Sequence, residues 1–125
     1  MPHDLRQWPD TVYPGEAQQL PQAVIEIDAA IRALSRDGPK LEEYSFKPLG
    51  KKKDYLWQIN FKANGQQIRI LYAPYGSTIV IFRIHKKSSK QEQQRAYDLA
   101  GKRKREADKI IKTKDLSHVG RITIH

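Results

Sequence analysis

The stretch "DYLWQINFKANGQQIRILYA", residues 54–73, decides the fold because it consists of two strand-like segments joined by a tight turn. The dipeptide Asn64-Gly65 is the strongest short hairpin signal in the chain, since both residues tolerate the left-handed backbone of a two-residue turn. Apolar and polar residues alternate in the segment before the turn. The stretch therefore predicts an antiparallel β-hairpin.

A two-residue turn at this position fixes which side chains face each other across the hairpin. The cross-strand pairs that it places on one apolar face are Trp57 with Tyr72, Ile59 with Ile70, and Phe61 with Ile68. The polar residues that it places on the opposite face are Gln58, Asn60, Lys62, Gln67 and Arg69. We expect the apolar face to pack against a helix, and the polar face to form a positively charged trough that binds phosphodiesters.

A third strand is predicted from about Thr78 to His85, and two registers are open to it. One register buries Arg83 and His85 in the core, where an unpaired charge is costly. The other places both on the polar face, with Arg83 opposite Arg69 and His85 just beyond. The residues that this second register packs inside are Val80, Phe82 and Ile84. We choose the second register, in which two neighbouring arginines are best tolerated where an anion bridges them.

One helix is predicted before the hairpin. Apolar residues recur at helical spacing from Leu20 to Leu34 and form a single stripe, which is most simply a core face. The sequence Asp37-Gly38-Pro39 ends this helix. Residues 1–19 contain three prolines and a glycine, which predict a loop or a short edge strand near Thr11–Tyr13.

A second helix is predicted after the third strand, from about Ser89 to Lys112, with a serine as the cap at its start. The block "KRKRE", 102–106, is expected on its surface, and "VGRITIH", 119–125, is a short strand or a loose tail. Together these segments predict an α+β fold. Its expected divisions are an N-terminal loop or edge strand (1–19), a single domain (20–112) and a C-terminal strand or tail (113–125).

The length and composition of the chain exclude several classes of protein. It has 125 residues, enough for one compact domain, and no cysteine, which excludes a disulfide framework and a thiolate metal site. No apolar run approaches transmembrane length, and residues 1–6 are polar. We therefore expect a cytoplasmic protein without a membrane partner.

The charge of the chain is unevenly distributed. The net charge is +9. Residues 1–45 contain 4 Lys and Arg against 8 Asp and Glu, a net charge of −4, and residues 46–125 contain 19 against 6, a net charge of +13. Such asymmetry indicates a surface that contacts a polyanion such as nucleic acid or the ribosome.

The residue types on the polar face suit RNA cleavage without a metal or other cofactor. The histidines, which have no partner at metal-ligand spacing, are His3, His85, His118 and His125. In RNA cleavage by transesterification the ribose 2′-hydroxyl attacks phosphorus, and fixed cations stabilise the charge that develops. An imidazole such as that of His85 has a pKa suited to proton transfer near neutral pH.

Four motifs carry a resemblance to a known family. In chain order they are "FKPLG" (46–50), "YLWQINF" (55–61), "IRILYA" (68–73) and "IVIFRIHKKSSK" (79–90). With the flanking helices, they make residues 20–108 similar to the HigB-like branch of the RelE/ParE toxin superfamily. The resemblance implies a small antiparallel sheet with an N-terminal helix packed on one face. It also implies a toxin that cleaves messenger RNA on the ribosome, and a cognate antitoxin, often a helix-turn-helix protein.

The resemblance also implies roles for individual residues. By position, Lys47, Arg69, Lys86 and Lys87 match the basic residues of the family's site. His85 is a candidate acid or base as well, but this role is inferred from its position in the sequence and not from the resemblance. The further cations that we expect to bind RNA are Lys62, Arg83, Lys90 and Arg95.

The chain departs from the family's pattern at two places. It has Gln58-Ile59-Asn60 where the family commonly has Glu-Leu-Arg, and 88–92 replaces a usual Thr-Gln-Lys-Thr-Pro. An arginine expected on the polar face is therefore absent. Two alternatives to the nuclease stay open, namely a ParE-like inhibitor of DNA gyrase without chemistry of its own, and a non-toxic basic RNA-binding module.

Overall fold

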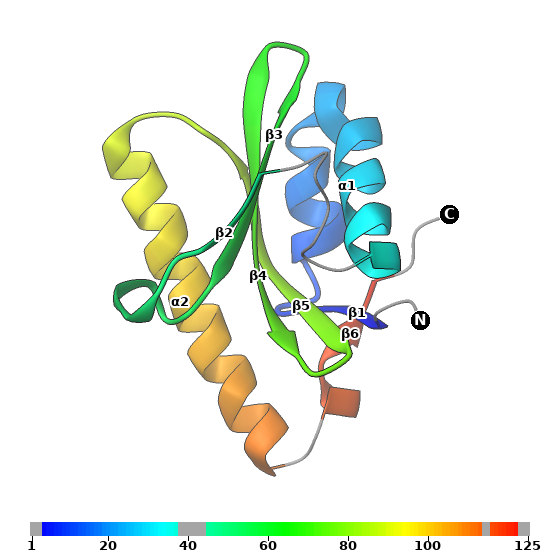
Figure 1. The fold of residues 1–125 in the computed structure, drawn as a ribbon, viewed down its shortest axis with the longest axis vertical. Coiled ribbons are helices and arrows are strands. Elements are labelled where there is room, and N and C mark those ends of the chain that lie inside the picture. Colours follow the sequence, from blue (N-terminus) through cyan, green and yellow to red (C-terminus); the bar gives the residue numbers. More distant parts are fainter. Residues whose placement is uncertain (1–3, 38–44, 114–115, 123–125) are drawn as a thin grey trace.

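The computed structural model describes residues 4–37, 45–113 and 116–122. Within these residues the chain forms an α+β fold, in which one six-stranded sheet has the strand order β2-β3-β4-β5-β1-β6. Helix α1 (Val24–Asp37) covers one face of the sheet and helix α2 (Lys90–Thr113) covers the other (Figure 1). The predicted fold class is confirmed.

The sheet is mainly antiparallel and is completed by strands from both ends of the chain. The strands are β1 (Asp4–Gln7), β2 (Ser45–Pro48), β3 (Trp57–Ala63), β4 (Gln66–Tyr75), β5 (Thr78–Lys86) and β6 (Gly120–Arg121). Short helical turns occupy Val12–Glu16, Pro21–Ala23, Lys51–Lys53 and Leu116–His118. None of the helices in the described parts of the chain is long and apolar enough to cross a membrane.

The hairpin of β3 and β4 has the predicted register. Asn64 and Gly65 form its turn with φ angles of 51° and 75°, the left-handed values that a two-residue turn of this kind requires. The three predicted apolar pairs lie opposite each other and pack against α1. The buried residues that α1 contributes to this core include Ile27, Ile31 and Leu34, all from the predicted stripe.

The predicted pairing of β4 with β5 is wrong by two residues. Arg69 lies opposite His85, and Arg83 lies opposite Leu71. Two features cause the shift. The turn before β5 is tight, with Tyr75 opposite Thr78, and Phe82 is an extra residue that forms a β-bulge. Arg69 and Arg83 are therefore not direct cross-strand neighbours.

The bulge also divides the apolar residues of β5 between the two faces of the sheet. Ile84 packs into the core under α1, whereas Val80 and Phe82 pack under α2. The prediction that these three residues share one interior is wrong, because the sheet is buried on both sides. Regular alternation is interrupted where Phe82 is inserted.

Helix α2 covers the face that was expected to form an open trough. Part of this face is apolar, since Leu56, Leu71 and Phe82 pack against Ala100 and Ala107 of the helix. The basic block 102–106 also lies only partly on the surface, because Arg103 and Lys104 are half-buried. The polar trough of the sequence analysis is thus reduced to the part of the sheet beneath the first turns of α2.

The N-terminal segment enters the sheet rather than lying at its edge. Strand β1 runs parallel to β5 and is flanked on its other side by β6. The strand lies at Asp4–Gln7 and not near Thr11–Tyr13, because Val12–Glu16 forms a helical turn that packs beside β5. The predicted helix end at Gly38-Pro39 and the last residues of the C-terminal strand lie outside the described residues.

Candidate functional site

Three polar residues form a row across the sheet beneath the start of α2. Asn60 on β3 and His85 on β5 are the direct cross-strand neighbours of Arg69 on β4. Each has a buried side-chain atom without a hydrogen-bond partner among the described residues, namely Asn60 Oδ1, Arg69 Nε and His85 Nε2. Buried polar atoms are normally satisfied in folded proteins, so three such residues in one row indicate a site that binds a ligand.

Helix α2 holds the guanidinium of Arg69 in place. One terminal nitrogen of Arg69 donates to Gln93 Oε1 at 2.6 Å and to the Tyr97 hydroxyl at 3.1 Å. The Tyr97 hydroxyl in turn donates to Gln58 Oε1 at 2.6 Å. Arg69 is half-buried and fixed from one side, whereas its Nε has no partner among the described residues.

The imidazole of His85 is buried and uncharged at neutral pH. Its residue is only 8% exposed, and burial is the main cause that lowers its pKa from 6.5 to about 4. The charges of Arg83 and Arg69 lower this pKa further, and the Lys86 carbonyl and Glu16 oppose the shift. His85 Nδ1 lies 3.2 Å from the Lys86 carbonyl oxygen, which can only accept, so Nδ1 carries the proton. Nε2 then offers a lone pair and can accept a proton.

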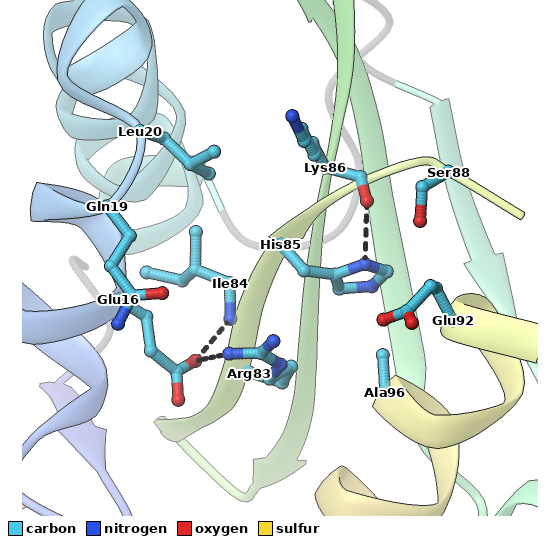
Figure 2. Close-up of a pocket in the computed structure, with 10 residues that line it drawn as sticks. All are labelled: Glu16, Gln19, Leu20, Arg83, Ile84, His85, Lys86, Ser88, Glu92 and Ala96. Carbon is cyan, nitrogen blue, oxygen red and sulfur yellow. Dashed lines mark hydrogen bonds and ion pairs between the residues drawn. The ribbon is translucent and has the colours of Figure 1, made fainter.

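A cavity of about 220 Å³ opens beside His85. It lies between the segment Glu16–Leu20 and the first turns of α2, and β5 forms its floor (Figure 2). The imidazole of His85 lies on the α2 side of this cavity, near Glu92, while the side chain of Lys86 points away from the ring (Figure 2). The cavity therefore reaches the polar row at His85, whereas Asn60 and Arg69 are not among the residues that line it.

Arg83 is engaged by a carboxylate that the sequence analysis did not identify. Glu16 is buried, and its oxygens lie 3.0 Å from an Arg83 nitrogen and 2.7 Å from an Arg103 nitrogen. The same carboxylate accepts the backbone N–H of Ile84 at 2.9 Å. Its role has no local signal in the sequence, because Glu16 lies in a segment whose prolines and glycine predict only a loop.

The remaining predicted cations do not all share the face of the polar row. Lys86 pairs with Ile68, which packs in the core under α1, so the Lys86 side chain belongs to the opposite face of the sheet from Arg69 and His85. Lys86 and Lys87 are exposed at the end of β5, and the Lys87 N–H donates to the Gln67 carbonyl at 2.7 Å. Lys62 is exposed opposite Gln67, which brings it to the same end of the sheet. Lys47 lies in β2 opposite Gln58.

The cations of α2 lie at the helix start. Lys90 is exposed at its first residue, and Arg95 is exposed and pairs with Glu92 at 3.1 Å. The start is capped as predicted, because the Glu92 N–H donates to Ser89 Oγ at 3.2 Å. The sequence analysis missed Gln93 and Tyr97. They are four residues apart, as are the buried Ala96 and Ala100, so they lie on the side of α2 next to its buried stripe. That position beside the stripe was the available signal.

No metal centre is found in the described part of the chain, where no three His, Cys, Asp or Glu residues are grouped so that they could hold an ion. The groups that this part of the chain does present at the polar row are the guanidinium of Arg69, the imidazole of His85 and the amide of Asn60. These groups bind anions and transfer protons.

We expect the stability of the fold to fall as the pH decreases from about 6.5 to 4, in part because of His85. In this window the unfolded imidazole binds a proton and the folded one does not, since its folded pKa is about 4, so protons favour the unfolded state. Urea unfolding at several pH values measures this effect. His85→Gln should flatten the dependence in this window, because it removes the imidazole that takes up the proton on unfolding. Equal pH slopes for the two proteins would contradict the assignment.

Comparison with known proteins identifies one sequence family. Residues 15–105 match the family described as Phage derived protein Gp49-like (DUF891). The match begins at the end of the Val12–Glu16 turn, includes α1 and strands β2 to β5, and ends within α2. No curated protein and no solved structure matches the chain.

Proposed function

We propose that this chain, which belongs to the phage-derived Gp49-like family of RelE-like type II toxins, is an endoribonuclease that cleaves messenger RNA on the ribosome. Membership of a toxin family implies a cognate antitoxin as a partner. The choice of RNA cleavage, and of a HigB-like rather than a ParE-like activity, rests on the polar row of Asn60, Arg69 and His85. Its unmet hydrogen-bonding atoms are the single observation that carries the proposal.

The proposed reaction is a transesterification within the RNA. The ribose 2′-oxygen forms a bond to phosphorus, the bond from phosphorus to the 5′-oxygen breaks, and the leaving oxygen takes a proton from solvent. His85 Nε2 accepts the proton of the 2′-hydroxyl. Arg69 donates to the phosphoryl oxygens as their negative charge increases.

The low pKa of His85 is compatible with this role. The charges of Arg69 and Arg83 contribute to lowering it. Burial is the main cause of the shift and would remain, but a bound phosphate would neutralise part of the positive charge and so raise the pKa of His85 from its value in the free protein. The imidazole would thus be an uncharged acceptor before substrate binds and a stronger base once the phosphate lies against Arg69.

The lysines at the end of the sheet supply further positive charge in this proposal. Lys87 is exposed two residues after His85, and Lys62 lies at the same end of the hairpin. Lys86 is exposed at this end as well, on the opposite face of the sheet, so it would contact RNA that passes around the edge of β5. As compact, mobile charges they suit the flanking phosphates of the RNA. The further contacts to the RNA backbone in this proposal are Lys47, Arg83, Lys90 and Arg95. Glu16 already neutralises part of the charge of Arg83.

Mapping of transcript ends during a short induction of the protein tests the proposal. New 5′ ends at a fixed phase within codons are expected, because cleavage on the ribosome occurs in the reading frame. Cells that carry Arg69→Ala provide the background of ends. Growth arrest without new RNA ends, accompanied by DNA damage signals, would overturn the proposal.

A gyrase inhibitor is the second candidate function. It is favoured by the way α2 covers the sheet, since Gln93 and Tyr97 occupy one side of Arg69. In this alternative the exposed and charged surface of α2 binds a protein, and Arg69 only holds the helix to the sheet. The transcript mapping separates the two functions, because an inhibitor of gyrase leaves the RNA uncut.

A further inference from the structure

The loop between β2 and β3 presents an aromatic ring and positive charge together. We call residues 50–55 the lysine loop, because it contains Lys51, Lys52 and Lys53. Lys51 and Lys52 are exposed. Tyr55 is 62% exposed and, among the described residues, is one of two large hydrophobic side chains with such exposure. An exposed tyrosine beside lysines has no explanation in the packing of the core.

The backbone of the lysine loop is strained at the residue that presents the ring. Asp54 and Tyr55 both have positive φ angles, 55° and 59°, although neither is glycine. A left-handed backbone is uncommon for such residues, and uncommon conformations persist where the surrounding structure imposes them. Because Tyr55 is exposed, this conformation does not serve to bury its ring, which points to a function outside the fold.

Contacts with α2 hold the lysine loop in this conformation. Asp54 forms an ion pair with Arg105 at 2.8 Å, and the ammonium of Lys53 lies 4.4 Å from the centre of the Tyr97 ring. Gly101 allows the approach, since a Cβ atom there would lie 2.2 Å from Asp54 Oδ2. Within the loop, the Tyr55 N–H donates to the Gly50 carbonyl at 2.9 Å. A loop held in this way loses little conformational entropy when a ligand binds.

The lysine loop lies next to the polar row. Tyr97 connects the two, because its ring contacts Lys53 and its hydroxyl lies 3.1 Å from an Arg69 nitrogen. Figure 1 shows that the segment between β2 and β3 reaches the side of α2. Glu92 and Ala96 of α2 line the cavity beside His85, whereas Gly101 and Arg105 meet the loop, so loop and cavity lie on different flanks of the helix.

We propose that the lysine loop is a second RNA-binding element, which stacks an unpaired base on Tyr55 and binds the adjoining phosphates through Lys51 and Lys52. Stacking on an aromatic ring combined with cations is the usual way in which proteins hold single-stranded nucleic acid without reading its sequence. The element goes beyond the proposed function, because cleavage at Arg69 and His85 does not require it. It would fix the RNA on the flank of α2 that faces away from the cavity.

The proposal is tested by measuring the affinity for a short 2′-O-methyl RNA by fluorescence anisotropy at several salt concentrations. Tyr55→Ala should weaken binding about tenfold with an unchanged salt dependence, whereas Tyr55→Phe should bind like the wild type. Lys51→Ala/Lys52→Ala should lower the slope of log K against log salt by about 1.4, since two phosphate contacts are lost.

Controls separate this proposal from general charge effects and from the cleavage reaction. Lys109→Ala/Lys112→Ala removes two exposed lysines near the C-terminal end of α2 and should change the affinity less than the loop pair does. The 2′-O-methyl group blocks the attacking oxygen, so binding is measured whether or not the protein cleaves RNA. Thermal unfolding confirms that each variant is folded.

Two outcomes would overturn the proposal. One is wild-type RNA affinity in folded Tyr55→Ala. The other is a loop variant that binds RNA like the wild type but no longer binds a protein partner such as the antitoxin. The second result would assign the lysine loop to a protein interface.

Discussion

Replacement of Arg69 by alanine is expected to abolish growth arrest on induced expression while the protein stays folded. In the proposed reaction the guanidinium donates to oxygens whose charge increases in the transition state. Loss of one such donor typically lowers the rate by about 100-fold or more. The rate of transcript cleavage in an assay with purified ribosomes measures this effect.

The structure explains why Arg69→Ala should stay folded. The substitution removes the hydrogen bonds to Gln93 and Tyr97, but Tyr97 keeps its bond to Gln58, and the Gln93 side chain keeps its bond to the Ser88 carbonyl. It also removes the buried Arg69 Nε, which has no partner among the described residues. The cost in stability is therefore expected to be small.

Two further variants sharpen the test of Arg69. Arg69→Lys keeps the charge but loses the planar fork that binds two phosphate oxygens, so it should recover little activity. Lys112→Ala removes an exposed charge from the far end of α2 and should leave growth arrest unchanged. Full toxicity of a soluble, folded Arg69→Ala protein would show that Arg69 only attaches α2 to the sheet.

The hairpin could be predicted from the sequence because its register depends on local signals. The Asn64-Gly65 turn sets the pairing, and each strand residue follows from it by alternation. The pairing of β5 could not be derived in the same way. Phe82 is an ordinary strand residue in sequence, and only the packing of both faces of the sheet makes it a bulge.

The sequence predicted which residues form the candidate site, but not which residues cover them. Alternation placed Arg69 and His85 on the same face, and they are direct neighbours there. What covers them comes from distant parts of the chain, since Gln93 and Tyr97 reach Arg69 from a helix more than twenty residues away. Long-range contacts of this kind leave no periodic pattern in the sequence.

The neutralisation of Arg83 has the same origin. Arg83 was expected to face phosphate on the basis of its neighbours in β5, yet its partner is Glu16, which lies in the Val12–Glu16 turn. The sequence shows the negative charge of residues 1–45 only as part of the overall asymmetry. In the folded protein one of those carboxylates is placed against the basic half and balances two of its arginines.

Of the substitutions discussed, Glu16→Ala is expected to lower the free energy of unfolding most. The carboxylate is buried, and its loss leaves Arg83, Arg103 and the Ile84 N–H without this partner. Removal of one partner from a buried ion pair typically costs 3–5 kcal/mol, and because the Arg83 side chain is 26% exposed we expect about 3 kcal/mol. The midpoint of urea unfolding at neutral pH measures the loss.

The position of Glu16 makes this loss specific to its charge and its hydrogen bonds. Glu16→Gln keeps an oxygen that can accept the Ile84 N–H but carries no charge, so its stability should lie between those of the wild type and Glu16→Ala. In Glu16→Ala, Arg103→Met should restore part of the stability, because it removes one of the two guanidinium groups that lose their carboxylate; the bond from Arg103 to the Phe82 carbonyl is lost with it, so the recovery should be partial. If Glu16→Ala had the same midpoint of urea unfolding as the wild type, the two arginines would have to be satisfied by water or other partners. The carboxylate would then not be what attaches the N-terminal segment to β5 and α2.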